Sequence, residues 1–193
     1  PVGAASKTFS TQNAIVKEDL KVGKTTSGSV TIKNTGNGML YAKVITSGKP
    51  DLGNEIAKSE NIELVVSYTN SDGDAIDPVA VKQGDEVLIT VTVRNTGITG
   101  TYKNLALTIP VPSGWEIENT RLHDFTASYS KDVPDYMDIR DDRVHLYFDL
   151  NQGYTKTFSI MCNASYFGNY YLPGTSIEAM YDNRIFSLVP GKW

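Results

Sequence analysis

The stretch Glu86–Gly97, EVLITVTVRNTG, is the clearest strand pattern in this chain of 193 residues. Its apolar residues Val87, Ile89, Val91 and Val93 fall at every second position, which places them on one face of a β-strand. The strand ends in Asn-Thr-Gly, which is typical of turns because asparagine and glycine tolerate positive φ. The stretch therefore predicts a strand with one buried face, followed by a hairpin turn.

The same pattern occurs once more in the chain. Val30–Gly36, VTIKNTG, matches Val91–Gly97, VTVRNTG: each is a strand that ends in a basic residue and the same turn. Two copies do not make a repeat array. We interpret them as the same type of strand and hairpin turn, used in two separate β units.

Alternating apolar residues continue along most of the chain. No segment keeps the 3.6-residue period of an amphipathic helix, and Asp51–Lys58 could form one short helical turn at most. The fold is therefore predicted to be all-β, an antiparallel immunoglobulin-like β-sandwich. The inward-facing sets are expected at Ile62, Leu64, Val66 and Tyr68; at Leu105, Leu107, Ile109 and Val111; at Val144, Leu146, Phe148 and Leu150; and at Phe158, Ile160 and Cys162.

The first 50 residues are predicted to form a small β segment of their own. Gly28–Lys33 alternates with Val30 and Ile32 inward, the segment 34–38 is typical of a turn, and Met39–Ile45 is the expected return strand. The pattern breaks at Ser47–Gly53, SGKPDLG, where glycine and proline interrupt it. We place a boundary there, between residues 1–50 and a sandwich over residues 51–193.

Bulk composition excludes two classes of partner. The net charge of −4 and the pI near 5.2 argue against nucleic acid, which requires a concentrated basic face. No apolar run approaches the ~20 residues of a spanning helix, so direct membrane insertion is not expected. The chain begins at Pro1 and not at methionine, and we expect a trimmed piece of a longer protein.

Residues that could carry chemistry are few. The single cysteine, Cys162, excludes an internal disulfide and falls on the inward stripe with Phe158, which favours a buried and unreactive thiol. Neither His123 nor His145 has the spacing of a metal ligand, and His145 is on an outward face. We expect no catalytic residue, no metal site, no cofactor and no enzyme activity.

Two acidic segments have simpler interpretations. The segment 70–74, NSDGD, resembles the start of a calcium loop but lacks the downstream glutamate, so a hairpin turn is expected. Asp124 and the pair Asp141 and Asp142 could supply carboxylates. General acid–base chemistry needs two carboxylates that converge in a pocket, and the sequence does not indicate one. We expect Asp141 and Asp142 to form a turn.

The aromatic run 166–172, YFGNYYL, leaves two interpretations open. Its rings could pack at the end of the sandwich or at a domain interface. Alternatively, Tyr166, Tyr170 and Tyr171 could form a platform for a sugar, and the chain would then be a cell-surface adhesion or carbohydrate-binding module.

The C-terminal stretch Leu172–Gly191, LPGTSIEAMYDNRIFSLVPG, predicts two closing strands, Leu172–Tyr181 and Arg184–Val189. Alternation in the first strand separates Ile177, Ala179 and Tyr181 from Glu178 and Met180. From the pattern alone, Met180 and Tyr181 are ordinary packing residues of a closing strand, since apolar strand residues mostly lie in the core.

The stretch also carries a resemblance. Its LPG and EAMY segments resemble the C-terminal end of bacterial α2-macroglobulins, a family of large, many-domain protease traps. The resemblance extends backward through Ile139–Leu150, Leu107–Asn119 and Val81–Gly97, and it covers most of the chain from about Asn61 onward. That family holds an internal thioester, made from a Cys-x-Glu-Gln motif, in a separate helical domain. The motif is absent at Cys162, which is followed by Asn-Ala-Ser.

The resemblance implies a domain organisation and an interface. Residues 1–50 would be the C-terminal part of a CUB-like β domain, and residues 51–193 the last macroglobulin-like sandwich. Met180 and Tyr181 would contact the thioester domain of the same parent chain, and Asp182, Asn183 and Arg184 would form a polar rim.

The resemblance also implies a broad-spectrum protease inhibitor that meets its target proteases through the whole protein. This chain would be its non-catalytic part, and it would shield the thioester while the protein is in its closed state. The implied location is the periplasm or cell envelope of a Gram-negative bacterium, with a lipid anchor on a distant N-terminus as one arrangement.

Overall fold

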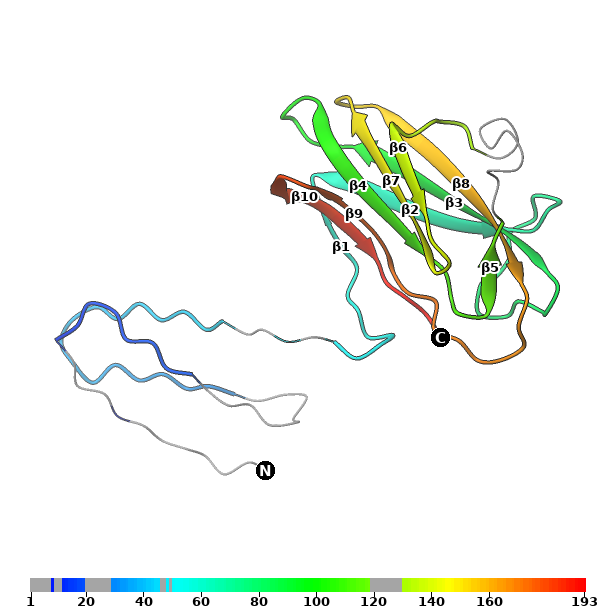
Figure 1. The fold of residues 1–193 in the computed structure, drawn as a ribbon. Helices are drawn as coiled ribbons and strands as arrows, with labels where there is room; N and C mark the ends of the chain where they lie inside the picture. Colours follow the sequence, from blue (N-terminus) through cyan, green and yellow to red (C-terminus); the bar gives the residue numbers. More distant parts are fainter. Residues whose placement is uncertain (1–7, 9–11, 20–28, 46–47, 49, 119–129) are drawn as a thin grey trace. The chain divides into compact units, whose positions relative to one another are not determined.

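The computed structural model describes residues 8, 12–19, 29–45, 48, 50–118 and 130–193 (Figure 1). The chain divides into two units, Pro1–Ser47 and Gly48–Trp193. Every regular element within the described ranges is a β-strand. None of these residues belongs to a helix that could cross a membrane.

The second unit is a sandwich of two antiparallel sheets (Figure 1). The larger sheet has the strand order β1, β10, β9, β4, β7, β6, with the bounds β1 Lys58–Glu60, β10 Asp182–Val189, β9 Thr175–Ala179, β4 Tyr102–Pro110, β7 Arg143–Leu150 and β6 Tyr136–Ile139. The smaller sheet has the order β2, β3, β8, β5, with the bounds β2 Ile62–Thr69, β3 Glu86–Asn95, β8 Thr155–Ala164 and β5 Trp115–Ile117. The predicted antiparallel all-β sandwich is confirmed.

The core lies between the sheets and uses the predicted stripes. Val87, Ile89, Val91 and Val93 of β3 are all buried, and their neighbours on the strand face outward. The stripes predicted for β4, β7 and β8 are buried as well, and in β2 Val66 and Tyr68 are partly buried against the core. Phe148 and Phe158 meet from opposite sheets with ring centroids 4.7 Å apart. Burying apolar surface at about 25 cal/mol per Å² is what holds the two sheets together.

One edge of the sandwich is formed by a strand that changes sheets. β1 pairs with β10 in the larger sheet, and β2 begins two residues after β1 ends and pairs with β3 in the smaller sheet. Asn61 makes this transition with a φ of 61°, a left-handed conformation that asparagine adopts more readily than most residues. The Nδ2 of Asn61 donates to the carbonyl oxygen of Arg184 at 2.9 Å, which secures the corner to β10.

Three local predictions differ from the structure. Asp51–Lys58 contains no helical turn, and its last residue instead begins the edge strand β1. The short edge strand β6 was not predicted, although Met137 and Ile139 alternate with polar neighbours and pack against the core. The first closing strand, β9, ends at Ala179, before the two residues that were predicted to finish it.

The first unit contains no strand within its described residues, and all of those residues are exposed. The expected turn is present: the side chain of Asn34 accepts the Gly36 amide at 3.0 Å and donates to the carbonyl oxygen of Gly38. The strands predicted on either side of it are not observed within 29–33 and 39–45. A two-stranded hairpin without a packed face is at best marginally stable, which explains the difference. The assignment of residues 1–50 to a CUB-like domain stays a prediction.

In the second Asn-Thr-Gly copy the asparagine, Asn95, is buried and makes more hydrogen bonds than Asn34. The side chain of Asn95 accepts the Gly97 amide at 3.1 Å, as Asn34 does for Gly36. It also donates to the carbonyl oxygens of Gly100 at 2.9 Å and Leu150 at 3.1 Å. One asparagine thus satisfies the polar groups of the turn after β3 and of the end of β7.

Candidate domain interface

Met180 and Tyr181 lie at the tip of the hairpin that joins β9 to β10 (Figure 1). Ile177 and Ala179 are buried, as the alternation predicted, whereas Met180 is 52% exposed and Tyr181 83% exposed. The interpretation of these two residues as ordinary core packing is therefore wrong. β9 ends before them, and the turn carries their side chains beyond the core.

The hairpin tip is attached to the neighbouring strands. The Met180 amide donates to the carbonyl oxygen of Asn104 at 3.1 Å. Asn104 lies in the irregular pairing between Tyr102 and Leu105, and its φ of 54° is left-handed. Its own amide donates to Oδ1 of Asp149 at 2.8 Å. The tip is thereby connected through β4 to the end of β7.

Asn104 was missed in the sequence, although its surroundings contained a signal. The apolar alternation of β4 starts at Leu105, and the preceding polar residues, Lys103 and Asn104, break it just after Tyr102. An asparagine at such a break is typical of a bulge, since asparagine tolerates the left-handed backbone that bulges often need.

The three predicted rim residues lie directly beside the tip. Asp182 accepts the Arg184 amide at 3.1 Å, Nε at 2.9 Å and Nη2 at 2.8 Å. This contact lowers the pKa of the Asp182 carboxyl to about 2, because the Arg184 guanidinium favours the charged form. Asn183 is exposed. The six consecutive residues from Glu178 to Asn183 line a shallow, open hollow of about 440 Å³.

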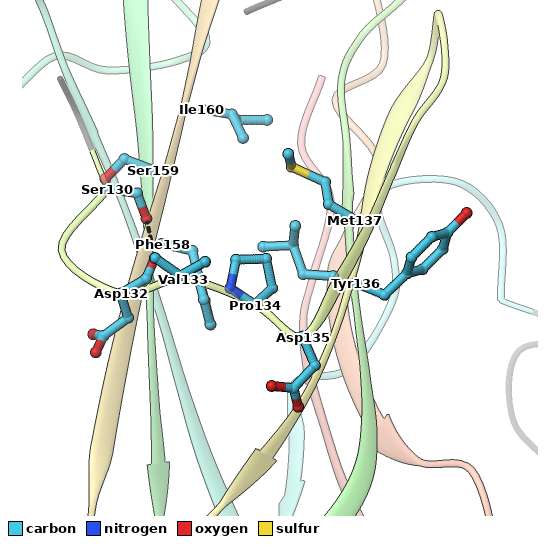
Figure 2. Close-up of a pocket in the computed structure, with 11 residues that line it drawn as sticks. Ser130, Asp132, Val133, Pro134, Asp135, Tyr136, Met137, Phe158, Ser159 and Ile160 are labelled. Carbon is cyan, nitrogen blue, oxygen red and sulfur yellow. Dashed lines mark hydrogen bonds between the residues drawn. The ribbon is translucent and has the colours of Figure 1, made fainter. Parts of the chain in front are cut away.

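A second hollow, of about 230 Å³, lies between β6 and β8 (Figure 2). Figure 2 shows Met137 and Ile160 pointing toward each other across it, while Tyr136 points away. Two carboxylates at its margin accept hydrogen bonds from backbone amides. Asp132 accepts one from the Thr157 amide at 2.7 Å, and Asp135 accepts one from the Asp149 amide at 3.1 Å. Both carboxylates therefore stabilise the edge of the sandwich and do not form a converging acid pair.

The remaining candidate residues have structural partners. Burial raises the pKa of the Cys162 thiol to about 12, which keeps it protonated. The Nδ1 of His145 is 3.0 Å from the hydroxyl of Thr108, on the outer face of the larger sheet. Within the described ranges no group of three acidic, histidine or cysteine side chains could hold a metal. His123 and Asp124 lie outside those ranges.

The two acidic segments are turns. Asn70 accepts the backbone amides of Asp72 at 3.0 Å and Asp74 at 2.8 Å, so the segment 70–74 is a turn closed by its own asparagine. Asp142 pairs with Arg143, which lowers the pKa of the Asp142 carboxyl, in the turn between β6 and β7. Both predicted turns are confirmed.

The tyrosines of the aromatic run make separate contacts within the second unit. Tyr170 lies against Gly114 and Gly168, where an added Cβ would meet its ring at 2.3 and 2.7 Å. Tyr171 packs on Trp193 with centroids 5.4 Å apart and donates to Glu55. These contacts favour packing over a shared sugar platform, because two of the three rings are engaged by the protein itself.

The family can be identified by comparison with known proteins. The model of the bacterial alpha-2-macroglobulin MG10 domain matches residues 62–183, more than half of the chain. The chain belongs to this family. The matched range begins with β2 and ends within β10, so it includes the hairpin that carries Met180 and Tyr181.

A curated relative is similar in sequence over most of this chain. The alpha-2-macroglobulin homolog of Yersinia pestis is 28% identical over 157 residues, which is 70% of this chain and 8% of the relative. The MG10 chain thus spans less than a tenth of that relative's length.

Solved structures share the fold. Salmonella alpha-2-macroglobulin reacted with methylamine is 21% identical, with a TM-score of 0.63 over 73% of this chain and 9% of that one. Native Escherichia coli alpha-2-macroglobulin, from domain MG7 to the C-terminus, is 18% identical, with a TM-score of 0.63 over 75% of this chain and 25% of that one.

Proposed function

We propose that this chain is the C-terminal, non-catalytic part of a bacterial α2-macroglobulin-like, broad-spectrum protease inhibitor. In the closed state of the protein, this part covers the thioester domain of the same parent chain and shields the thioester from water. The observation that carries the proposal is the exposed pair Met180 and Tyr181 at an anchored hairpin tip of an MG10 domain.

The similar structures support a protein that is activated by proteases and reacts with an amine. One is an E. coli alpha-2-macroglobulin activated by trypsin, another is E. coli alpha-2-macroglobulin activated by porcine elastase, and the Salmonella protein was reacted with methylamine. An amine reacts with an electrophilic acyl group such as a thioester. Cleavage by proteases of different specificity is what a broad-spectrum trap requires.

The chemistry of the tip suits a cover over a reactive group. A thioester survives in water only where water and nucleophiles are kept away from it, and apolar or aromatic side chains can exclude them. Met180 can adapt its shape to a neighbouring surface, and Tyr181 offers a broad ring with one polar group.

A cover of this kind must also separate from the thioester after the protease has cut. The charged Asp182–Arg184 pair and the exposed Asn183 stay well hydrated at the margin of the tip, so the contact would be modest in apolar area. Such an interface favours the closed state without locking it, and a change elsewhere in the protein could shift the equilibrium.

The proposal includes a location and a set of partners. The chain would act in the periplasm or cell envelope, where foreign proteases arrive, and would meet them only through the whole inhibitor. Cell fractionation with an antibody against the parent protein tests the location, and recovery in the cytosol would contradict it.

The deciding experiment replaces Met180 and Tyr181 together by alanine in the full-length protein. The rate at which the thioester is lost in buffer, measured by release of a free thiol, should rise several-fold over that of the unchanged protein. Phe167→Ala is the matched control, because Phe167 is an exposed aromatic residue in the loop after β8, away from the hairpin tip. Equal rates for all three proteins would refute the shielding role.

A further inference from the structure

The β3–β4 loop and the β7–β8 turn lie at the same end of the sandwich as the β9–β10 hairpin (Figure 1). Each of these two connections carries an exposed apolar side chain. Ile98, in the loop between β3 and β4, is 91% exposed, and Tyr154, in the turn between β7 and β8, is 66% exposed. Neither side chain contributes to the core. Three separate turns of the chain therefore offer apolar tips at one end of the domain.

The loop of Ile98 and the turn of Tyr154 are held together by hydrogen bonds. The backbone amide of Asn95 donates to the carbonyl oxygen of Tyr154 at 3.1 Å, and Nε2 of Gln152 donates to the carbonyl oxygen of Gly97 at 3.2 Å. The hydroxyl of Thr101 donates to Oδ1 of Asn151 at 2.9 Å. The two connections between the sheets, the β3–β4 loop and the β7–β8 turn, are thus joined to each other by hydrogen bonds.

These two connections are also linked to the β9–β10 hairpin through further hydrogen bonds. The hydroxyl of Tyr102 donates to the carbonyl oxygen of Asn61 at 3.0 Å, and Asn61 in turn donates to Arg184. On the other side of the hairpin, Asn104 holds the amide of Met180. Hydrogen bonds therefore set the backbone positions of the three turns relative to one another, and little backbone conformational entropy is lost when a partner covers them.

We propose that Ile98 and Tyr154 form one docking surface with Met180 and Tyr181, and that its occupant is a single domain of the same polypeptide outside these 193 residues. This inference rests on the proposed function and widens the contact from one hairpin to the end of the sandwich. It assigns Ile98 and Tyr154 as contact residues in the closed state.

The choice of occupant follows from the length of the relatives and from the character of the surface. The chain matches 8% of the Yersinia protein and 9% of the Salmonella structure, so most of such a protein lies outside it. A few apolar tips among polar residues such as Gln152 and Asp182 match the modest, mixed interfaces that domains of one chain form with each other.

Hydroxyl-radical footprinting of the full-length protein tests the inference, because it measures the solvent access of single side chains. In the intact protein, Ile98 and Tyr154 should be oxidised several-fold more slowly than their intrinsic reactivity and exposure in this domain predict, as should Met180 and Tyr181. Cleavage by trypsin should restore all four rates together. Tyr136, which is 64% exposed on the edge strand β6, is the matched control for Tyr154.

The outcomes separate the inference from the proposed function. If Met180 and Tyr181 are protected while Ile98 and Tyr154 oxidise at their unprotected rates, as Tyr136 is expected to, the wider surface is overturned and the shielding role stands. If none of the four is protected, both fail. Tyr154→Ser supplies a second measurement: it should weaken the protection of Met180, and Tyr136→Ser should not. Unchanged protection of Met180 in Tyr154→Ser would overturn the single surface.

Discussion

The carbonyl oxygen of Asn104 accepts the amide of Met180 at 3.1 Å, and this bond attaches the exposed hairpin tip to β4. The bond is made by a bulge residue whose backbone is left-handed, with a φ of 54°, and we expect the direction of its carbonyl to depend on that conformation. A residue of the interior strand β4 therefore fixes how the tip of the neighbouring β9–β10 hairpin is presented.

Replacing Asn104 tests this dependence. Alanine at this position would have to adopt the left-handed conformation, which costs an L-residue roughly 1–2 kcal/mol. Asn104→Ala should therefore reduce the free energy of unfolding in urea by about 1 kcal/mol. Asn104→Gly is the matched control, since glycine adopts positive φ freely, and it should lose less. The prediction fails if the alanine variant is as stable as the glycine variant.

The two Asn-Thr-Gly copies allow a comparison of one motif in two environments. Asn95 is buried and its side chain makes three hydrogen bonds, so Asn95→Ala leaves buried polar groups without partners and should cost roughly 2–4 kcal/mol in urea unfolding. Asn34 is exposed, and Asn34→Ala should change the stability of the sandwich by less than about 0.5 kcal/mol. Losses of similar size would contradict the role of burial.

The carboxyl of Asp182 should titrate far below its ordinary pKa. Arg184 lowers that pKa from 3.8 to about 2. A depressed pKa in the folded state means that the contact contributes fully above pH 3.8 and is lost as the pH falls through about 2. The carboxyl carbon resonance of Asp182 in an NMR titration should therefore move with a midpoint near 2. Arg184→Gln should raise the midpoint, and an unchanged value would exclude the guanidinium as the cause.

Cys162 should be unreactive until the domain unfolds. Burial raises its pKa from 9.0 to about 12, which leaves roughly a thousandfold less thiolate at neutral pH. Ellman's reagent at pH 8 should therefore label the native 193-residue chain only slowly and the chain in concentrated urea at once. Ser71→Cys adds an exposed thiol in the turn after β2 and serves as the positive control. Rapid labelling of native Cys162 would show that the core opens.

The strands of the core could be predicted because their sequence period matches their burial. In β3 and β7 an apolar residue stands at every second position and these residues are buried, while the residues between them face outward, so the local pattern and the tertiary structure agree. The turn at Asn70 could be recognised from its cluster of Asn, Ser, Asp and Gly, which favour turns. β6 escaped prediction because a four-residue edge strand contains too few alternations to stand out.

The candidate interface could be predicted only in part. The resemblance pointed to Met180 and Tyr181, but the pattern alone placed them in a strand, since a Met-Tyr pair can continue the alternation of Ile177 and Ala179. Ile98 and Tyr154 each occur singly in a turn, and no local pattern distinguishes them. Their common position depends on two crossings between sheets that are far apart in the sequence, which only the tertiary structure reveals.

The strand that changes sheets at Asn61 also determines where a mechanical load would enter the domain. Tension on the chain at Gly48 would first meet the contacts of Leu52 with Trp193 and of Glu55 with Tyr171, and then the three residues of β1. β1 pairs with β10, the same strand that begins at the Met180–Tyr181 tip. A pull from the N-terminal side would therefore load β1 first and then, through its pairing, β10, the strand that carries the exposed hairpin.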